Sequence, residues 1–313
     1  MKKNIINLAI IIPYFKISYF EDVLFALSKQ TNQNFNLYIG NDNSPNSPYE
    51  IIKKFGTQLN ITYKKFDINL GEKDLVSQWH RCLDMVKFEE WVLFLPDDDF
   101  ISENVIDEFY KGLNFQNSYQ IKIFRLPISI IDKNSNIIDD LNFNDPLIET
   151  NLDYYQRVVR GEAGGSLGDN IFHKKTLLKR GGFVNFPKAW GSDHATVLQV
   201  ASGGTIYFLS KARLYFRMSG ENISSDISDG LIKLDARIKF AKWIKSNETI
   251  FPKKPNIDFY KYFYWKAEYY ILNKWKFDIR LFKKLFELRY VCFQSNNIFP
   301  IIKIFLKKLK VIK

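Results

Sequence analysis

Three consecutive carboxylates are the first residues whose type and spacing could do chemistry. Asp97, Asp98 and Asp99, together called the acidic turn, follow the apolar run 91–95. Like charges about 4 Å apart repel by roughly 1 to 4 kcal/mol, depending on the dielectric. A divalent cation such as Mg²⁺ or Mn²⁺ would relieve this repulsion and could share its coordination with a diphosphate. The alternative is a solvated turn that leads into a helix near Ser102.

A further aspartate lies in each of two polar segments. Asp42, within residues 41–44 (NDNS), follows an apolar run and either contacts a ligand or only forms an Asx turn. Asp193, within WGSDHA, stands at the expected start of a helix. It acts as a general base or, together with Ser192, only caps that helix. The residue types alone leave both alternatives open for each aspartate.

Residues 1–100 alternate short apolar runs with helical periodicity, a pattern that predicts parallel βαβ units. The expected strands cover 8–12, 35–39, 60–66 and 91–95, and the expected helices cover 19–30, 48–55 and 73–86. In an open parallel sheet, ligands bind outside the carboxyl ends of the strands. Pro13 and Tyr14 follow the first strand, Asp42 the second and Asp97 the fourth, so we expect these residues to share one edge.

The following residues predict strands and helices of more mixed composition. Ser102 can cap a helix whose apolar face includes Ile106 and Phe109. Residues 161–168 (GEAGGSLG), called the glycine loop, contain four glycines, which predict unusual backbone angles or movement. We expect further strands at 121–126, 128–131 and 205–209, a turn at 132–136, and helices from 192 and around 234–243.

The composition predicts a folded protein. Hydrophobic residues make up 46% of the chain, and 28 Phe, 17 Tyr and 6 Trp can bury ample surface, which excludes intrinsic disorder. Cys82 and Cys292 are too few for a disulfide framework, and no Cys/His cluster indicates zinc, so a reducing cytoplasm fits. The apolar run 5–12 is interpreted as a strand, and no stretch reaches the ~18 apolar residues of a membrane span.

The net charge of +11 is unevenly distributed. Residues 251–313 carry 15 Lys and Arg against 4 Asp and Glu, whereas residues 1–250 hold 30 of each. A neutral first part argues against a nucleic-acid-binding protein, in which basic charge covers a binding face. Pro252 and Pro255 punctuate the chain where the balance changes, so we expect an α/β domain over 1–250 and a basic, aromatic, helical region over 251–313.

The last residues, 301–313, have the pattern of an amphipathic helix. One face would carry Ile302, Phe305, Leu306, Leu309 and Ile312, and Lys303, Lys307 and Lys310 would lie largely opposite. Such a helix can lie in the interface of an anionic membrane, where each nearby Lys adds ~1 kcal/mol of attraction. The alternative is that its apolar face packs on the preceding domain.

Seven segments occur in a characteristic order, namely LAIIIPYF, LYIGNDNSP, NLG, WVLFLPDDDF, GGF, WGSDHA and FRMSGENIS. Their order and spacing resemble the family 2 glycosyltransferases of the GT-A fold, in particular the branch that acts in bacterial surface polysaccharide assembly. The resemblance covers roughly residues 5–225. It implies a Rossmann-like, mostly parallel sheet flanked by helices.

The resemblance implies a donor site at the strand ends. Pro13 and Tyr14 would border the base and ribose of a nucleotide, and Asp42 would contact the uracil ring. The acidic turn matches the DxD region of the family, so Asp97 and Asp98 would contact the donor and all three carboxylates are candidate metal ligands. Pro96 stands where the family often has an acidic residue, which leaves the division of these roles open.

On the acceptor side, the resemblance identifies Asp193 with the catalytic base, although Ser192 stands where a Glu often precedes that base. Arg217 and Asn222 lie in a stretch that approaches the diphosphate in relatives. Arg217 would pair with phosphate, or with a carboxylate in a structural role. The glycine loop would border the acceptor or form an ordinary connection.

The resemblance thus implies an inverting, metal-dependent enzyme that moves a sugar from a UDP-sugar to a hydroxyl of a surface polysaccharide or lipid-linked oligosaccharide. We expect it to be peripheral on the inner face of the cytoplasmic membrane. One alternative is a nucleotidyltransferase that makes sugar nucleotides, but residues 13–16 lack its glycine- and cation-rich phosphate loop. Another is a non-catalytic carbohydrate- or lipid-binding accessory protein of the same fold.

Overall fold

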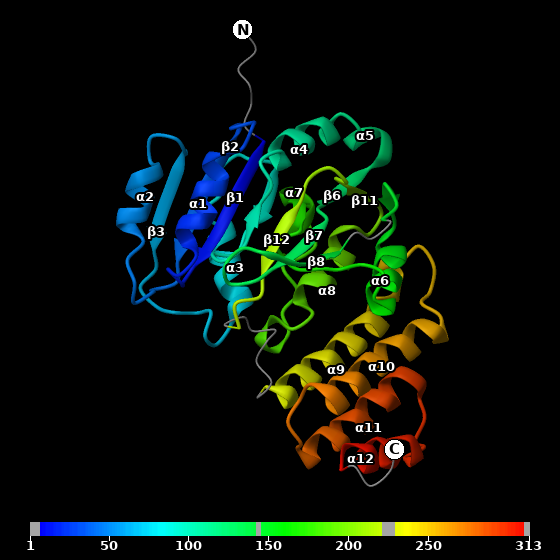
Figure 1. The fold of residues 1–313 in the computed structure, drawn as a ribbon. Coiled ribbons are helices and arrows are strands. Elements are labelled where there is room, and N and C mark those ends of the chain that lie inside the picture. The colour runs from blue at the N-terminus through cyan, green and yellow to red at the C-terminus, as the bar shows by residue number, and fades with distance from the viewer. Residues whose placement is uncertain (1–6, 142–144, 221–228, 310–313) are drawn as a thin grey trace.

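A computed structural model describes residues 7–141, 145–220 and 229–309 of the protein. These residues form a large mixed sheet with helices on both faces, a smaller sheet, and a group of C-terminal helices (Figure 1). The large sheet has the strand order β3-β2-β1-β4-β10-β6-β11-β9, and the smaller one has the order β5-β12-β7-β8. Asn222, Lys310 and Ile312 lie outside the described residues.

The first half of the large sheet is parallel. Its strands are β1 (Leu8–Tyr14), β2 (Phe35–Asn41), β3 (Ile61–Lys65) and β4 (Trp91–Phe94), connected by α1 (Phe20–Ser28), α2 (Tyr49–Phe55) and α3 (Leu75–Leu83). β1 lies between β2 and β4, with Leu8 opposite both Phe35 and Trp91. The predicted parallel βαβ units are confirmed, and the carboxyl ends of β1, β2 and β4 meet at one edge.

The central strand β1 is buried on both faces. Leu8, Ile10 and Ile12 face one core, and Ala9 and Ile11 face the other. Successive side chains of a strand alternate between faces, so an unbroken apolar run is required here. The first core is closed by α1, α2 and α4 (Val105–Leu113), and the second by α3, α6 (Asn151–Arg160), α7 (Lys174–Lys179) and α8 (Ser192–Val200).

The second half of the sheet mixes directions. The antiparallel strand β10 (Asn170–His173) lies between β4 and β6 (Ile121–Arg125), while β11 (Thr205–Phe208) runs parallel to β6 and pairs with β9 (Ile148–Glu149). The smaller sheet contains β5 (Phe100–Ile101), β7 (Ile128–Ile131), β8 (Ile137–Leu141) and β12 (Leu214–Arg217). The strands expected at 121–126, 128–131 and 205–209 are therefore confirmed.

The helix expected from Ser102 begins later than predicted. Its N-cap is Asn104, and the Ser102 hydroxyl donates a 2.7 Å hydrogen bond to Asn104 Oδ1 instead of capping the helix. Phe100 and Ile101 pair with β12 as strand β5. The cap assignment was wrong because this short strand, which no local pattern marks, extends the chain before the helix can start.

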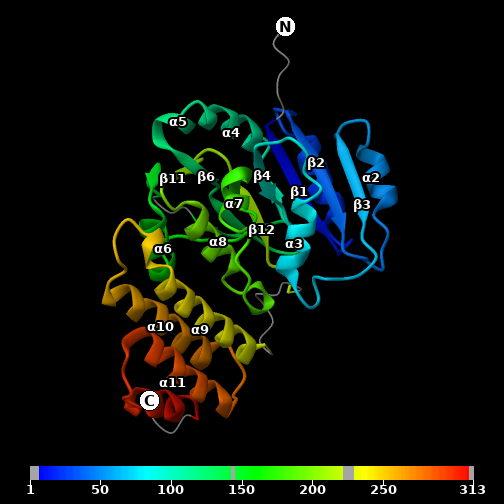
Figure 2. The same cartoon turned by 180° about the vertical axis from the view of Figure 1, so that it is seen from behind.

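The C-terminal helices are α9 (Gly230–Ser246), α10 (Ile257–Asn273), α11 (Ile279–Phe293) and α12 (Phe299–Lys308). α9 packs against α11 and against the short turn η1 (Pro187–Ala189), and α10 packs against α6. Figures 1 and 2 show α9 and α10 directly below α6 and α8. Helices on both sides of residue 250 therefore share one apolar core with the face of the sheet that α8 covers.

The last helix, α12, has two apolar sides. Ile301 and Ile304 are buried against the other C-terminal helices, whereas Phe299, Ile302 and Leu309 are exposed. The apolar face expected at the chain end is therefore divided between a packed side and a solvent side. Among the described residues, no helix is both long enough and apolar enough to cross a membrane.

Candidate active site

The acidic turn is tied to the end of β1 through Asp97. Asp97 Oδ2 accepts 2.6 Å hydrogen bonds from the backbone amides of Phe15 and Lys16. Asp97 is only 8% exposed. This burial, together with the charge of Asp98, raises the pKa of its carboxyl to about 7. The carboxyl ends of the neighbouring parallel strands β1 and β4 therefore lie side by side, as the sequence predicts.

Asp99 faces the second sheet. Its Oδ1 accepts a 2.8 Å hydrogen bond from the amide of Arg217, and its buried Oδ2 has no hydrogen-bond partner among the described residues. Burial, with the charge of Asp98 next in size, raises the pKa of Asp99 well above its usual range. A buried carboxylate oxygen without a donor is costly unless a cation or a proton satisfies it.

Arg217 holds the acidic turn in place. Its side chain is fully buried, and Nε donates to the carbonyl oxygen of Asp98 at 2.9 Å. Nη2 lies 3.2 Å from Asp22 Oδ2, and the guanidinium lies 4.2 Å from the centre of the Tyr19 ring. These contacts favour the structural alternative for Arg217, because its donors already bind groups of the protein. Its predicted contact with a donor diphosphate stays a prediction.

The donors of the acidic turn fit a divalent cation that takes its other ligands from a diphosphate and water. Asp99 Oδ2 needs a partner, and Asp98 Oδ2 lies 4.0 Å from Lys16 Nζ. Within the described ranges, no three His, Cys, Asp or Glu side chains converge on one point. Mg²⁺ commonly uses one or two carboxylates together with substrate phosphates, so this sparse donor set suits it or Mn²⁺.

Asp42 anchors the turn that follows β3. Its Oδ1 and Oδ2 accept 2.8 Å hydrogen bonds from the amides of Leu70 and Gly71. The carboxylate also forms an ion pair with Arg81, whose guanidinium stacks 4.1 Å from the Phe66 ring centre. Sequence reasoning missed Arg81, because a cation on a surface helix carries no local signal. The Asp42 carboxylate therefore does more than form an Asx turn.

Pro13 and Tyr14 lie at the end of β1 beside Asp42. The Asp42 amide donates to the carbonyl oxygen of Tyr14 at 2.9 Å. The Tyr14 ring is fully buried against Phe20, and its hydroxyl donates to the carbonyl oxygen of Asn46 at 2.9 Å. Burial raises the pKa of Tyr14 to about 12. The Tyr14 side chain is therefore buried below the surface of this region, whereas Pro13 is partly exposed.

Asp193 lies in the first turn of α8. Gly191, with a φ of 83°, is the N-cap, and no side chain caps the helix. The Ser192 hydroxyl accepts a 3.0 Å hydrogen bond from the amide of Phe186. Asp193 is partly exposed and accepts a 2.8 Å hydrogen bond from the amide of His194. The predicted helix start is confirmed, but neither Ser192 nor Asp193 acts as its cap.

The glycine loop lies between the acidic turn and Asp193. A Cβ at Gly168 would be 3.0 Å from Pro96 Cδ, at the start of the acidic turn. A Cβ at Gly165 would be 2.4 Å from His194 and 2.7 Å from the Tyr154 hydroxyl. Close approach of the backbone to both sides thus requires glycine at these two positions. The loop brings the two groups of carboxylates to one region of the molecule.

No pattern in the sequence marks the buried ionic cluster around Arg125. This side chain is 2% exposed, pairs with Asp145, and lies 3.4 Å from Asp169 Oδ2 and 3.7 Å from Glu149 Oε1. Its Nη2 donates to the carbonyl oxygen of Gly164 at 3.1 Å. Because Gly164 belongs to the glycine loop, the cluster fixes that loop against the sheet. The charge of Asp193 contributes to raising the pKa of Asp169 to about 6, after burial.

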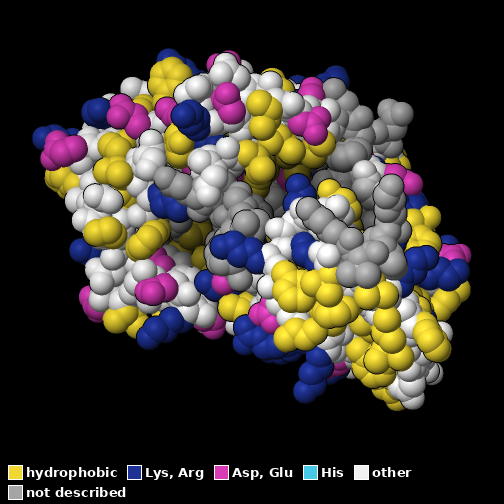
Figure 3. Space-filling model, turned by 60° about the horizontal axis from the view of Figure 1, so that its bottom comes forward, with side chains coloured by type: hydrophobic (Ala, Val, Ile, Leu, Met, Phe, Trp, Pro, Cys, Tyr) yellow, Lys and Arg dark blue, Asp and Glu magenta, His cyan; other side chains and the backbone are white. Residues whose placement is uncertain are grey.

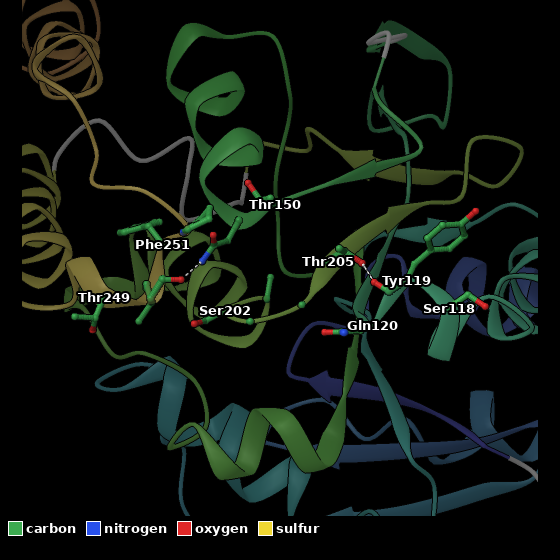
Figure 4. A pocket seen from close by; sticks show the side chains of 14 residues that line it. Ser118, Tyr119, Gln120, Thr150, Ser202, Thr205, Thr249 and Phe251 are labelled. Carbon is green, nitrogen blue, oxygen red and sulfur yellow. Dashed lines mark hydrogen bonds between the residues drawn. The ribbon is translucent and has the colours of Figure 1, made fainter.

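A separate pocket of about 470 Å³ is lined by residues of α5 (Gln116–Tyr119), the start of α6 and the end of α8 (Figure 4). The Asn151 amide donates to the carbonyl oxygen of Ile250 at 2.9 Å, and the Thr205 hydroxyl donates to that of Tyr119 at 2.7 Å. These polar groups are satisfied within the protein. No candidate aspartate lines this pocket, so it is not the site that the sequence predicts.

Residues 9–157 match the family model for glycosyl transferase family 2. This match, together with solved structures of similar fold, confirms the predicted recognition, fold class and enzyme class. A search of curated protein sequences found no significant match.

Two solved structures illustrate the fold. S. aureus TarS 1-349 in complex with UDP-GlcNAc has a TM-score of 0.57 at 18% identity, covering 92% of this chain and 73% of that one. GalNAc-T7 with UDP, GalNAc and Mn²⁺ has a TM-score of 0.57 at 11% identity, covering 93% of this chain and 56% of that one. Both are glycosyltransferase structures that share the GT-A fold with this protein.

Proposed function

We propose that the protein is an inverting glycosyltransferase that moves a sugar from a UDP-sugar to a hydroxyl of a growing surface polysaccharide or lipid-linked oligosaccharide. The carrying observation is the glycine loop, which contacts Pro96 on one side and His194 on the other. It thereby places the acidic turn and Asp193 on either side of one region. We assign residues 1–250 to the catalytic domain and residues 251–313 to a helical extension.

The donor occupies the edge formed by β1, β2 and β4. Pro13, Tyr14 and Asp42 border the base and ribose, as their positions at the ends of β1 and β2 permit. Solved structures of similar fold contain UDP-GlcNAc, or UDP with Mn²⁺, which supports a UDP-sugar and a divalent metal. Asp97 and Asp98 contact the ribose or diphosphate, and Arg217 lies behind them and holds their turn in place.

The acidic turn would hold the metal, with Asp99 as the principal ligand and Asp98 and Asp97 beside it. The supporting observation is the buried Asp99 Oδ2, which has no hydrogen-bond donor among the described residues. When bound, Mn²⁺ or Mg²⁺ neutralises charge that develops on a leaving diphosphate. The turn is rigid before a ligand arrives, because the amides of Phe15, Lys16 and Arg217 already fix Asp97 and Asp99.

Asp193 acts as the general base. The acceptor oxygen attacks the anomeric carbon from the face opposite the diphosphate, forming the new C–O bond as the carbon–oxygen bond to phosphate breaks. Asp193 takes the acceptor hydroxyl proton, and the diphosphate leaves with the electron pair of the broken bond. A single displacement inverts the anomeric centre. A positioned base contributes ~10²–10⁴-fold to the rate, and the partly exposed carboxylate, which accepts a hydrogen bond from the His194 amide, suits this role.

The test is a panel of nucleoside diphosphates and nucleotide sugars, with and without Mn²⁺, assayed by thermal stabilisation and by release of UDP. We expect UDP and one or more UDP-sugars to stabilise the protein in a Mn²⁺-dependent way, and slow UDP release from the correct donor. No response to any nucleotide would favour a non-catalytic accessory protein. Release of pyrophosphate from UTP and a sugar 1-phosphate would indicate a nucleotidyltransferase instead.

We also propose that the C-terminal region docks on an anionic membrane surface. Phe299 and Ile302 of α12 and its C-cap residue Leu309 are 77%, 43% and 45% exposed, and Lys303 and Lys307 beside them are exposed as well. Figure 3 shows hydrophobic side chains gathered over the C-terminal helices with basic side chains at the margin. This combination suits a bilayer with acidic headgroups. The enzyme would then work at the inner face of the cytoplasmic membrane, near a lipid-linked acceptor.

A further inference from the structure

Two basic side chains of the C-terminal helices bond to backbone carbonyl groups and have no acidic partner among the described residues. Arg237 of α9 donates from Nη1 to the carbonyl oxygen of Phe263 at 3.2 Å, and Lys266 of α10 donates to that of Val158 at 3.4 Å. In the part of the chain that the structure describes, neither residue forms an ion pair. Most other cations of α9 and α10 that lie on the surface, such as Lys261 with Asp258, do form one.

A series of packed aromatic rings connects α9 to the residues on either side of Asp193. A Cβ at Gly191, the N-cap of α8, would be 2.9 Å from the ring of Phe240, which lies one turn after Arg237 in α9. The Tyr155 ring lies 5.3 Å from that of Phe240 and 5.6 Å from that of His194. Helices α9 and α10 lie directly below α6 and α8 in Figures 1 and 2. The segment of α9 that carries Arg237 therefore packs against the start of α8, where Asp193 lies.

The electrostatics agree with this placement. After burial and the charge of Asp193, the charges of Lys266 and Arg237 act on His194 and help to lower its pKa. Arg237 and Asp193 also act with opposite signs on the pKa of Tyr155. The charges of Asp193, Arg237 and Lys266 thus all act on His194.

Holding both cations here is unfavourable in the absence of an anion. Burial, followed by the charge of Arg237, lowers the pKa of Lys266 to about 8. Arg237 Nε is buried, and no group within the described ranges accepts a hydrogen bond from it. The rings of Phe263 and Tyr270, 5.0 and 5.9 Å away, compensate the guanidinium only in part. Asp193 supplies one negative charge against two positive charges, so the region retains the capacity to bind a further anion.

We propose that Arg237 and Lys266 bind a phosphoryl group of the acceptor and so orient its hydroxyl toward Asp193. This inference rests on the proposed function, because it assigns a substrate class to the acceptor side of that site. Arg and Lys are the side chains that proteins use to bind phosphate. The phosphoryl group has two possible sources with the same chemistry, namely a phosphodiester within a polymer and the diphosphate that links a glycan to a lipid.

The experiment measures anion binding with the donor site already filled. Protein saturated with UDP and Mg²⁺ is titrated calorimetrically with dimethyl phosphate, a phosphodiester, and with geranyl diphosphate, a lipid-linked diphosphate, with geraniol as the uncharged control. We expect at least one anion to bind, and Lys266→Met and Arg237→Met to weaken it at least tenfold. Lys266→Arg retains most of the binding. Lys261→Met, on the same helix but paired with Asp258, serves as the matched control and binds as the wild type does.

The possible results distinguish a failure of the proposed anion site from a failure of the proposed function. Tight binding of dimethyl phosphate identifies the polymer phosphodiester, and binding of geranyl diphosphate but not geraniol identifies the lipid diphosphate. If UDP fails to bind but an anion still binds through Lys266, the anion site stands and the donor assignment falls. If UDP binds and neither anion does, or both Met variants bind as the wild type does, the inference is overturned. Should Arg237→Met not fold, the partly exposed Lys266 decides the question alone.

Discussion

The backbone amide of Arg217 donates a 2.8 Å hydrogen bond to Oδ1 of Asp99, and no donor among the described residues reaches the other oxygen of that carboxylate. Asp99 directly precedes β5, and Arg217 ends β12, with which β5 pairs in the smaller sheet. The same arginine holds the carbonyl oxygen of Asp98 through Nε. The strand pairing therefore decides which oxygen of the acidic turn is available to a cation.

Asp99→Asn tests the metal assignment. The amide oxygen can still accept from the Arg217 amide, so the fold should persist, but the negative charge is lost. We expect Mn²⁺-dependent stabilisation by UDP to disappear and turnover to fall at least about 100-fold, equivalent to about 2.7 kcal/mol. Asp107→Asn, in the first turn of α4, is the control and should behave as wild type. Full metal response in the Asp99 variant would contradict the assignment.

Asp193→Asn tests the general base. Asparagine can replace the hydrogen bond to the His194 amide, so donor binding and thermal stability should change little. Transfer should fall by ~10²–10⁴-fold, because no group remains to take the acceptor proton. The measurement compares kcat for transfer with the Kd for UDP. The control is Asp153→Asn, which makes the same change in the first turn of another helix, α6. Unchanged transfer would mean that another group is the base.

Gly165→Ala tests the packing of the glycine loop. The added Cβ would meet His194 at 2.4 Å and the Tyr154 hydroxyl at 2.7 Å, so the loop or both side chains must shift. Overpacking of this kind typically costs about 1–3 kcal/mol. We expect a lower unfolding temperature together with reduced transfer. Gly56→Ala, whose added Cβ finds no atom closer than 3.7 Å, should leave both unchanged or slightly increase stability. Equal behaviour of the two variants would disprove close packing at Gly165.

The pKa of Asp97 predicts a pH dependence of stability without metal. Its carboxyl has a pKa of about 7 in the folded protein, against an ordinary value of 3.8. Between these values the folded state holds a proton that the unfolded state has lost, so this group's contribution to stability falls as the pH rises and is lost above about 7. Asp97→Asn removes this term.

The measurement is the free energy of unfolding from urea titrations at pH 5 and pH 8 in the presence of a chelator. We expect the free energy of unfolding of Asp97→Asn, measured relative to that of the wild type, to be higher at pH 8 than at pH 5. Taking the difference between the two proteins removes the contributions of other titrating groups, such as Asp169 and His194. A difference that does not vary with pH would show that Asp97 is ionised throughout.

A double variant of α12 tests the membrane proposal. Replacing the exposed Phe299 and Ile302 by Ser removes apolar contacts with a bilayer but no packed core residue. We expect at least tenfold weaker co-sedimentation with phosphatidylglycerol vesicles, and weaker binding of the wild type in high salt or to phosphatidylcholine. The matched control replaces the exposed Ile137 and Ile138 of β8 by Ser and should bind normally. Equal binding by both variants would place the membrane contact elsewhere.

The sequence alone determined the parts of this protein that depend on short-range patterns. The unbroken apolar runs of β1 and β4 predict central strands, because a strand buried on both faces has no place for polar residues. The edge at which Asp42 and Asp97 meet follows from parallel strand order alone. The helix start before Asp193 was likewise visible from the polar turn that precedes it.

Only the tertiary structure decided how the candidate residues are used. Arg217 became a buried support of the acidic turn, and Arg81 became the partner of Asp42, because strands and helices distant in sequence meet there. The side of α12 that packs on its neighbours, and the pairing of Arg125 with three acidic segments, also depend on contacts across the fold. A local pattern records which residues can be buried, whereas the partner of a charge is fixed only when separate elements come together.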